Sequence, residues 1–342
     1  MSEFDFSREL IAWYWQNKRD LPWRNTSDPY AIWVSEIMLQ QTRVEAVKPY
    51  YHRFLTELPT ISHLANADDE KLHKLWEGLG YYSRVRNMKK AAITCMEQYG
   101  GRLPETRKEL LSLCGIGDYT AAAVGSIAFG LPDPAIDGNV LRVMGRYLAI
   151  GRVITERTVK EEIRTFLSSV IPKDDPGAFN SALMELGATL CGPDKDARCG
   201  GCPLLPRCAA FQQGRTTELP IRAQKAPKRI EQKTVFILQC EKKTAFIKRP
   251  EKGLLAGLWA LPDAAGHLND EEARQFLENQ GCAVESITAL PNARHVFTHI
   301  VWEMKGYLVK VHTPGCYSFF EKEEAEKLAL PSAFCAYRPF LW

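Results

Sequence analysis

The sequence lacks any run of the ~18 apolar residues that a membrane-spanning helix needs, so we expect no membrane segment. It also lacks a strong charge bias, because 44 Lys and Arg residues stand against 41 Asp and Glu residues, a formal net charge of +3. That small excess permits a nucleic-acid partner without favouring one. There is no tandem repeat, which excludes a solenoid. The polar start, Met1-Ser-Glu-Phe-Asp5, lacks the pattern of a signal peptide, so we expect a cytoplasmic protein.

What the sequence does contain is typical of a globular protein. Its 342 residues are 45% hydrophobic and 25% charged, which is enough apolar material for a sizeable core. At ~100–200 residues per domain, this length predicts two domains, or one domain with an elaborated second part. There are ten Cys residues and no export signal. This combination argues against a disulfide framework and favours metal binding wherever the Cys residues cluster.

Helical periodicity dominates up to about residue 213. Apolar residues recur three and four positions apart, which predicts helices over Arg8–Lys18, Ala31–Val47, Asp69–Gly78, Arg84–Tyr99, Thr120–Phe129 and Asn139–Tyr147. Residues 214–231 then hold two Pro, two acidic residues and five basic residues, namely Arg215, Arg222, Lys225, Lys228 and Arg229. This composition predicts either a solvated linker or a strap that lies along a polyanion.

From Thr234 onward the pattern changes to strands with one short helix. Thr234–Cys240 and Thr244–Lys248 flank Glu241-Lys-Lys243, which predicts a β-hairpin. A helix is predicted over Asp270–Gln280, with Gly281 placed to end it, and further strands over Ala293–Thr298 and Gly306–Val311. We therefore expect a mainly α N-terminal part followed by a smaller α+β domain.

A cluster of Cys residues is the strongest chemical signal. It consists of Cys191, Cys199, Cys202 and Cys208, just beyond a predicted helix over Asn180–Leu190. Thiolates select zinc or iron–sulfur clusters. A zinc knuckle would more often show two C-x2-C pairs, whereas this segment has one. The spacing therefore favours a [4Fe–4S] cluster, and the remaining Cys residues are scattered and are interpreted as core or incidental thiols.

A glycine pair precedes an Ala-rich segment in Leu113-Cys-Gly-Ile-Gly-Asp-Tyr-Thr-Ala-Ala-Ala123. Gly115 and Gly117 permit a tight turn whose N–H groups, together with those of the helix start, can bind a phosphate without side-chain charge. Alone this pattern is weak, since many helix connections need Gly. Its position strengthens it, because an acidic residue, Asp137, follows one helix later.

Two acidic residues are candidates for acid–base chemistry. Glu36 lies on the apolar stripe of a helix that Asp28 should cap and Pro29 should open, so burial should raise its pKa and make it a general acid near neutrality. Asp137 can cap the helix that begins at Gly138 and still present one oxygen to a substrate. Taken singly, a solvent-facing Glu and a simple cap are the plainer interpretations. Together they supply the protonated acid and the carboxylate that cleavage of a glycosidic bond requires.

With these residues in place, the chain resembles the MutY-type adenine DNA glycosylases of the helix–hairpin–helix superfamily, from about Leu10 to Cys208 and more loosely beyond. The resemblance rests on the glycine pair, the Cys cluster and four further motifs: Leu21-Pro-Trp-Arg24, Trp33-Val-Ser-Glu-Ile-Met-Leu-Gln-Gln-Thr-Arg43, Trp76-Glu-Gly-Leu-Gly-Tyr-Tyr-Ser-Arg84 and Ile136-Asp-Gly-Asn-Val140. It implies removal of adenine that is mispaired with 8-oxoguanine or guanine in double-stranded DNA, by a monofunctional and monomeric enzyme with one [4Fe–4S] cluster.

The resemblance also implies roles for individual residues. Glu36 would protonate the departing adenine and Asp137 would stabilise the sugar cation, assisted by Tyr119 and Asn139. The other expected site residues hold the extruded adenine (Trp23, Arg24), bind DNA (Gly115, Gly117) or enter the base stack (Gln41, Leu79, Tyr81), and the cluster ligands would be Cys191, Cys199, Cys202 and Cys208. Without the family, Gln41, Leu79 and Tyr81 would be read as helix surface and core.

The sequence departs from the family pattern at several positions. The first gap of the Cys cluster has seven residues where six are usual, so Cys191 is the ligand most in question. Cys114 replaces a Pro in the hairpin, and Asp118 adds a negative charge beside the expected phosphate site. Ser181 stands where relatives often carry Glu or Gln near the adenine, so that contact is expected to be lost.

The C-terminal part resembles the Nudix-like domain that such glycosylases use to sense 8-oxoguanine. Gly253-Leu-Leu-Ala-Gly-Leu-Trp259 fits this domain, but Asp270-Glu-Glu-Ala-Arg274 does not supply the order of acids that a catalytic Nudix box needs. We therefore expect a recognition module, in which Phe297, Thr298 and His299 match the loop that meets 8-oxoguanine.

The expected domain organisation follows from these assignments. Residues 1–213 form a helical glycosylase region, in which 22–130 make a six-helix barrel with the hairpin and 1–21 with 131–213 make the iron–sulfur domain. Residues 214–231 are the basic linker, and 232–342 are the Nudix-like recognition domain.

Three other functions compete with this interpretation. An endonuclease III-like glycosylase with lyase activity would need an amine to form a Schiff base where this chain has Tyr119, whose phenol cannot do so. A non-enzymatic scaffold would be favoured by loss of Glu36 or Asp137, and both are present. Nucleotide pyrophosphohydrolase activity is disfavoured by the degenerate Nudix box.

Overall fold

The computed structural model describes residues 5–193, 197–224 and 226–342. The polar start at residues 1–4, Lys225 of the basic linker and residues 194–196 in the first gap of the Cys cluster lie outside the described residues. The chain divides into two compact units, the first made of Met1–Asn66 and Arg86–Gln224 and the second of Ala67–Val85 and Lys225–Trp342. Among the described residues, none of the helices combines the length and apolar character needed to cross a membrane.

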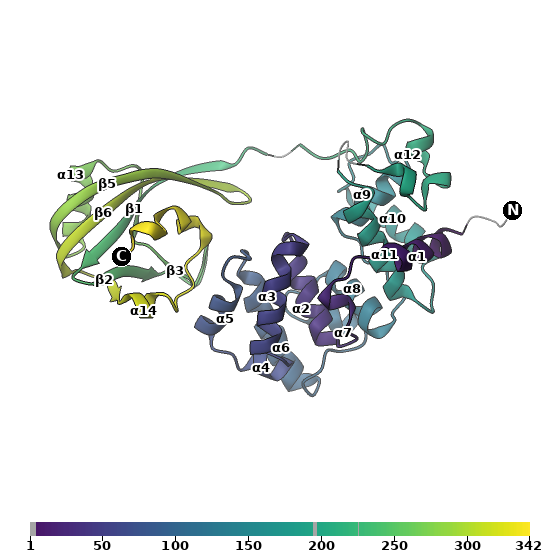
Figure 1. The fold of residues 1–342 in the computed structure, drawn as a ribbon, viewed down its shortest axis with the longest axis horizontal. Helices are drawn as coiled ribbons and strands as arrows, with labels where there is room; N and C mark the ends of the chain where they lie inside the picture. The colour runs from purple at the N-terminus through teal and green to yellow at the C-terminus, as the bar shows by residue number, and fades with distance from the viewer. Residues whose placement is uncertain (1–4, 194–196, 225) are drawn as a thin grey trace. The chain divides into compact units, whose positions relative to one another are not determined.

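The first unit is helical (Figure 1). Its α-helices are α1 (Phe6–Asn17), α2 (Pro29–Leu39), α3 (Val44–Glu57), α4 (Ile61–Ala65), α6 (Ser83–Gln98, which starts in the second unit), α7 (Arg107–Ser112), α8 (Asp118–Phe129), α9 (Gly138–Tyr147), α10 (Arg157–Val170), α11 (Pro176–Thr189) and α12 (Ala209–Gln212). Short 3₁₀-helices cover Pro22–Arg24 (η1), Cys199–Gly201 (η2) and Leu205–Arg207 (η3).

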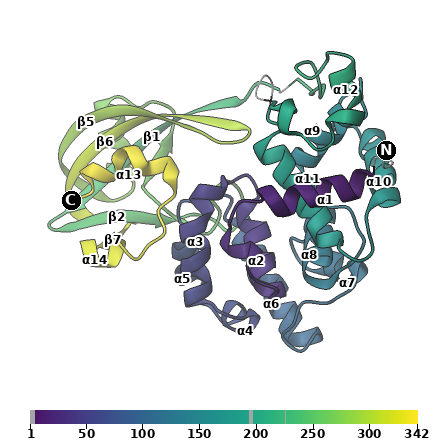
Figure 2. The same cartoon turned by 45° about the vertical axis from the view of Figure 1, so that its right-hand side comes forward.

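Helix α11 is the centre of this unit, because it contacts α1, α8 and α9 (Figure 2). Its residues Phe179, Leu183 and Leu186 are fully buried in a core shared with residues of α1, α9 and α10. Burial on several sides explains why the helix carries so few charged residues, since each buried charge would need a partner. The single charged residue of this helix, Glu185, is therefore conspicuous.

The predicted helices of this unit are confirmed, with one correction. The prediction of a single helix over Ala31–Val47 is wrong, because α2 ends at Leu39 and α3 begins at Val44. Gln41 in the break has φ of 60°, a left-handed conformation that interrupts a helix. The Gln40 side-chain amide donates to Thr120 Oγ1 at 3.2 Å, which fastens the break to α8. The apolar spacing continues through the break and therefore conceals it.

The second unit is built on a seven-stranded sheet of order β3-β2-β1-β6-β5, in which β4 also pairs with β1 and β7 with β2. The strands are β1 (Arg229–Cys240), β2 (Lys243–Lys248), β3 (Trp259–Ala260), β4 (Asp263–Ala265), β5 (Cys282–Val296), β6 (Ile300–Pro314) and β7 (Ser318–Phe320). The helices are α5 (Asp69–Trp76), α13 (Asp270–Asn279), α14 (Lys322–Ala325) and a 3₁₀-helix over Ser332–Phe340. Strands β1 and β6 are parallel and the other pairs are antiparallel.

The period-two pattern of β1 explains how this sheet is covered on both faces. Val235 and Ile237 enter one hydrophobic cluster with residues of the 3₁₀-helix, whereas Phe236 and Leu238 enter another with residues of α13. The predicted hairpin is confirmed, since Cys240 pairs with Lys243 across it. The predicted α+β character of this part of the chain is also confirmed.

Candidate active site

The first unit contains a cleft of ≈ 1410 Å³ bordered by α1, η1, α2, α8, α11 and the segment that precedes α9. All of the predicted catalytic, adenine-binding and DNA-binding residues of this unit line it, namely Trp23, Arg24, Glu36, Gln41, Gly115, Gly117, Tyr119, Asp137 and Asn139. Ser181, where relatives often carry Glu or Gln, lines it as well. The structure thus brings together residues that are more than 150 positions apart in the chain.

Glu36 is placed in the cleft by a helix whose start the sequence specifies. Asp28 accepts hydrogen bonds from the N–H groups of Tyr30 and Ala31, and Pro29 opens the first turn, as predicted. Glu36 is 5% exposed. Burial raises the pKa of its carboxyl to about 7, with a further rise from Asp137, although Tyr119 and Arg24 act in the opposite direction. The expected desolvated acid is therefore present.

Tyr119 is hydrogen-bonded directly to the Glu36 carboxyl group. Its hydroxyl donates to Glu36 Oε2 at 2.6 Å. Burial raises the pKa of Tyr119 well above its usual range, and the carboxyl groups of Glu36 and Asp137 raise it further. The phenol therefore stays neutral at physiological pH and serves as a donor, not as a nucleophile.

Asp137 occupies the position predicted for it at the start of α9. Its Oδ1 accepts from the Val140 N–H at 2.7 Å, and its Oδ2 accepts from Asn139 Nδ2 at 2.8 Å. Burial raises the pKa of Asp137, while these hydrogen bonds and the positive charge of Arg142 favour its ionised form. Asp137 thus caps α9, and the same hydrogen bonds fix the orientation of its carboxyl group. Glu36 lines the same cleft.

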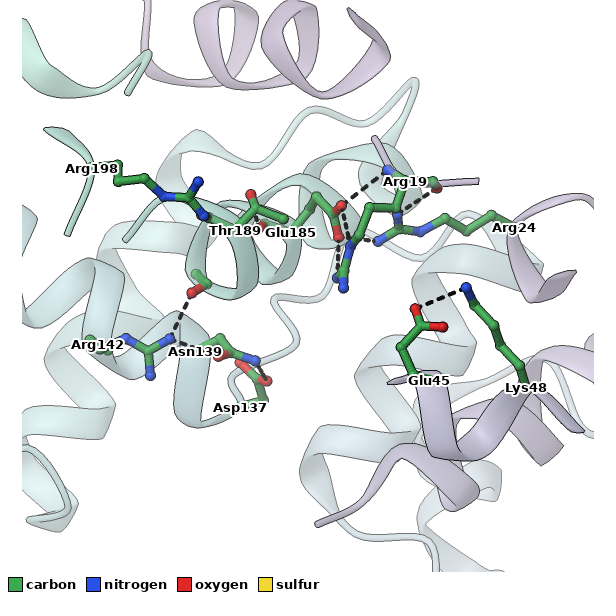
Figure 3. Close-up of polar contacts among 11 residues, drawn as sticks. Arg19, Arg24, Glu45, Lys48, Asp137, Asn139, Arg142, Glu185, Thr189 and Arg198 are labelled. Carbon is green, nitrogen blue, oxygen red and sulfur yellow. Dashed lines mark hydrogen bonds and ion pairs between the residues drawn. The ribbon is translucent and has the colours of Figure 1, made fainter. Parts of the chain in front are cut away.

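Arg142 extends this network in a way that the sequence analysis did not foresee (Figure 3). Its Nη2 donates to Asn139 Oδ1 and to the Gly187 carbonyl, each at 2.8 Å, and its Nε donates to the Cys191 carbonyl at 2.8 Å. One side chain therefore joins Asn139, and through it Asp137, to the first residue of the Cys cluster. The only sequence signal was its position on the same helix, one turn after Asn139.

Two arginines and a glutamate form a second polar group that was also missed in part. Arg24 was expected to hold adenine, but Arg19 and Glu185 were not identified. Glu185 accepts from both arginines (Figure 3). Burial alone would raise the pKa of Glu185, but the hydrogen bonds from Arg19 and Arg24 outweigh it and lower the pKa to about 2. Glu185 is therefore ionised throughout the physiological range.

Two further residues position the site without any catalytic signature in the sequence. Asn180 is fully buried, and its side chain bonds to the Ala135 N–H, the Asp133 carbonyl and the Ser126 hydroxyl. These bonds brace the segment that leads to Asp137. Gly187 lies where α11 crosses α9. A Cβ there would come within 2.6 Å of Asn139 Cβ, so the residue must be Gly.

The hairpin before α8 contains the two glycines that were expected to let a phosphate approach the backbone N–H groups. Gly115 has φ of 80°, and a Cβ on it would come within 2.7 Å of Asn87 Cβ. Gly117 precedes α8 as its N-cap and faces open space. Cys114 is exposed there. The negative charge of Asp118 has a partner, since Arg107 Nη2 donates to it at 2.6 Å.

The four clustered Cys residues, Cys191, Cys199, Cys202 and Cys208, line one small cavity together with Arg146. Arg146 Nη1 lies 3.2 Å from Cys191 Sγ. A β-bridge pairs Cys191 with Ala197 across the longer first gap of the cluster. The additional residue in this gap therefore does not remove Cys191 from the cavity that the other three Cys residues line. Within the described ranges, no three His, Cys, Asp or Glu side chains gather closely enough to hold a single metal ion.

The remaining predicted residues belong to the second unit. Leu79 is buried, whereas Tyr81 is half exposed and has φ of 47°. The hydroxyls of Tyr81 and Thr298 lie 2.7 Å apart, so a residue expected to enter the base stack meets one expected to contact 8-oxoguanine. Phe297 packs edge-on against Trp302 with ring centroids 4.9 Å apart. Thr298 and His299 are exposed.

Comparison with known proteins decides the family. Residues 34–169 match the HhH-GPD superfamily of base excision DNA repair proteins, and residues 234–337 match the NUDIX domain. The adenine DNA glycosylase of Rattus norvegicus is 35% identical over 353 residues, which cover 86% of this chain and 68% of the rat protein. The chain belongs to the adenine DNA glycosylase family. The corresponding protein of Buchnera aphidicola subsp. Acyrthosiphon pisum is 30% identical over 96% of this chain and 92% of its own length.

Solved structures agree with this adenine DNA glycosylase fold. A thermostable thymine-DNA glycosylase is 29% identical with a TM-score of 0.56, and it covers 61% of this chain and 95% of its own. Endonuclease III in a non-covalent DNA complex, at 24% identity and a TM-score of 0.51 over 60% of this chain and 94% of its own, supports the fold alone. The predicted family, fold class and base excision chemistry are confirmed. The chain is an adenine-removing glycosylase that hydrolyses N-glycosyl bonds in DNA, and the scaffold interpretation is wrong.

Proposed function

We propose that this adenine DNA glycosylase acts on adenine paired with 8-oxoguanine or guanine, uses Glu36 and Asp137 to break the N-glycosyl bond, and leaves the DNA strand intact. The observation that carries the proposal is the contrast between two carboxyl groups on one cleft. Burial raises the pKa of Glu36 to about 7, whereas hydrogen bonds and the positive charge of Arg142 oppose the rise that burial causes in the pKa of Asp137. Pairs of this kind separate acid and carboxylate roles.

The cleft is suited to an extruded nucleotide, because an enzyme that acts on a base must take it out of the duplex. Trp23 and Arg24 line the cleft and are assigned to holding the adenine. Glu36 donates its proton to the base as the bond to the sugar breaks, while Tyr119 fixes the orientation of the carboxyl. Asp137 offsets the positive charge on the sugar, and Asn139 holds Asp137 in place. A water molecule then completes the hydrolysis.

The monofunctional assignment depends on which groups could form a Schiff base. Tyr119 occupies the position at which a lyase would carry its amine, and a phenol cannot form an imine. Lys18 also lines the cleft, but its ammonium group lies 4.1 Å from the Trp15 ring centroid, in a cation–π contact at the outer edge of α1. For the endonuclease III-like alternative, the Lys18 amine would have to leave the Trp15 ring before it could form a Schiff base.

The four thiols of Cys191, Cys199, Cys202 and Cys208 are the donor set that a [4Fe–4S] cluster takes, and Arg146 next to Cys191 would offset part of its negative charge. Sulfurs around one zinc ion lie roughly 3.8 Å apart, given a Zn–S length near 2.3 Å, whereas a cubane spreads its ligands further. No three of these thiols gather closely enough, among the described residues, to hold a single metal ion, so we assign one iron–sulfur cluster to this cavity. When bound, it would cross-link the segment after α11.

The preference for 8-oxoguanine is assigned to Phe297, Thr298 and His299, with Gln41, Leu79 and Tyr81 as the residues that fill the gap in the base stack. The Thr298 hydroxyl keeps hydrogen-bonding capacity beside its contact with Tyr81, and the His299 side chain is exposed. Both can meet the C8 oxygen and N7 hydrogen that distinguish 8-oxoguanine from guanine. Gly115 and Gly117 are assigned to a DNA phosphate. We keep the domain boundaries given above, including the linker at 214–231, and a monomeric enzyme as parts of the proposal.

The test uses a duplex that holds one adenine opposite 8-oxoguanine. We expect free adenine to appear with the protein alone, and strand breaks to appear only after hot alkali. A matched duplex with thymine opposite the same adenine controls for non-specific release. Efficient strand breakage without alkali, or a covalent complex trapped by borohydride, would contradict the monofunctional assignment. Absence of adenine release from any mispair would contradict the substrate assignment.

A further inference from the structure

Glu185 is a charged side chain with no solvent contact, and all of its hydrogen bonds go to two arginines. Its Oε1 accepts from the Arg19 backbone N–H at 3.1 Å and from Arg19 Nε at 2.8 Å. Its Oε2 accepts from Arg19 Nη2 at 2.8 Å and from Arg24 Nη2 at 2.7 Å. The side chain is fully buried although it borders the cleft. Because a carboxylate has about four acceptor sites, none is left for a substrate.

Arg24 is held in one orientation by this arrangement. Its Nη2 bonds to Glu185, and its Nη1 donates to the Arg19 carbonyl at 3.0 Å. The guanidinium also lies 5.4 Å from the Tyr14 ring centroid, and its side chain is 14% exposed. An arginine fixed on three sides cannot reorient to meet Glu36, so its effect on that carboxyl is set by its partners.

We propose that Glu185 is a positioning residue of the adenine pocket, which fixes the Arg24 guanidinium and neutralises its charge beside the acid Glu36. The inference rests on the role proposed above for Glu36. It explains a feature that adenine contact does not, namely why a fully buried carboxylate on α11 binds two arginines at the edge of a cleft. Ser181, one turn earlier on the same helix, is too short to take this part.

The consequence follows from the groups that face Glu36. These are the Tyr119 hydroxyl from α8, the Asp137 carboxylate before α9 and the Arg24 guanidinium from η1. Asp137 favours the protonated form of Glu36, and Arg24 favours the ionised form. A carboxylate at 2.7 Å from Arg24 weakens the latter effect, because opposite charges in contact cancel at a distance. Removal of the Glu185 charge should therefore deplete the protonated acid at neutral pH.

The test is the pH dependence of adenine release under single-turnover conditions for Glu185→Gln. We expect the alkaline limb of the rate profile to move to lower pH by about one unit, since nearby charges shift a pKa by ~1–3 units. The matched control is Glu45→Gln, which removes one carboxylate from the same cleft. Glu45 is exposed and pairs with Lys48 at 2.9 Å (Figure 3), so this variant should keep the wild-type limb.

A second variant keeps the inference testable if Glu185→Gln fails to fold. In Arg24→Gln the cation is removed while Arg19 still satisfies Glu185 through three hydrogen bonds. The alkaline limb should then move to higher pH, opposite to the shift in Glu185→Gln. An unmoved limb in the folded variants would overturn the inference. If Glu36→Gln retained wild-type turnover, the proposed function itself would fail, so the two failures are distinguishable.

Discussion

At the scale of single residues, the chemistry depends on two carboxyl groups in different surroundings. Glu36 lies on a helix that is buried on nearly every side, from Tyr30 to Met38, so its charged form is disfavoured. Asp137 is also buried, but it stands at a helix start, where the Val140 N–H and the Asn139 amide stabilise its negative charge. The two carboxyl groups thus differ in protonation because their surroundings differ.

These surroundings predict a bell-shaped pH dependence. Glu36 acts in its protonated form, so adenine release should fall as the pH rises through about 7. Asp137 acts in its ionised form, so release should also fall at acid pH, with a midpoint above the ordinary Asp value of ~3.9 because burial raises its pKa. Single-turnover rates over a pH series measure both limbs. A rate that increases steadily through pH values well above neutrality would contradict the assignment of Glu36.

Much of this chemistry was predictable from local sequence. Asp28 and Pro29 set the start of α2, and Asp137 before Gly138 set the start of α9, so both acids could be located before the structure was known. Two partners that act through Arg24 could not be located. Glu185 and Arg19 reach the site through tertiary packing, and no local spacing records which helices will cross.

At the scale of elements, α11 organises the site, because it contacts α8, which carries Tyr119, and α9, which Asp137 caps, and because it precedes the Cys cluster. Asn180 braces the segment before Asp137, Glu185 holds the arginines, and Gly187 permits close contact with α9. These three residues lie on one helix, and Glu185 and Gly187, two positions apart, face opposite sides of it. Its periodicity predicted a helix, but not that its polar and small residues serve three separate neighbours.

The close contact at Gly187 predicts a large effect from a small change. In Gly187→Ala the added Cβ meets Asn139 Cβ at 2.6 Å, so α9 must shift and move Asp137. Overpacking costs roughly 1–3 kcal/mol, whereas the gain in helix propensity is only ~0.5–1 kcal/mol. We expect a lower free energy of unfolding in urea and a loss of adenine release of ~10-fold or more. Gly151→Ala is the control, because a Cβ at Gly151 meets nothing within 4 Å.

The four Cys residues of the cluster after α11 predict the iron content of the purified protein. Purified protein should be brown and carry about four irons per chain, since each thiolate of a cubane binds one iron. Cys202→Ser should lose most of the iron, and Cys191→Ser should do so as well because Cys191 lines the same cavity. Cys335→Ser, at an exposed Cys outside the cluster, should keep it. Stoichiometric zinc in colourless, active protein would contradict the assignment, as would full iron in the Cys202 variant.

At the scale of the whole molecule, the chain combines a helical glycosylase unit with a unit built on a mixed sheet. The second unit includes Ala67–Val85, an excursion from the N-terminal half of the sequence. There Glu70 accepts from Lys248 at 2.8 Å and from Trp259 Nε1 at 3.1 Å, and Glu77 pairs with Arg338. The strand and helix patterns predicted the sheet and α13. They could not predict this grouping, because it depends on contacts more than 150 residues apart.

These contacts determine how 8-oxoguanine recognition should be tested. Truncation before β1 would strip partners from Glu70 and Glu77, so substitution is the cleaner experiment. Thr298→Ala with His299→Ala should slow adenine release opposite 8-oxoguanine by ~10-fold or more and change release opposite guanine little, since a discriminating contact is worth ~1–3 kcal/mol. His312→Ala with Thr313→Ala changes the same two residue types at exposed positions on β6 and should leave both rates unchanged. Equal losses on both duplexes would indicate a structural role.

The central claim is that Glu36 is the acid that releases adenine. Its most direct test is the single-turnover rate of adenine release from a duplex with adenine opposite 8-oxoguanine, compared between the wild-type protein and Glu36→Gln, with duplex binding measured in parallel. The amide keeps the shape of the side chain and has no proton to transfer at neutral pH. We predict a rate lower by ~10²–10⁴-fold or more, with binding retained. A variant that binds the duplex and releases adenine at a rate close to that of the wild type would contradict the account.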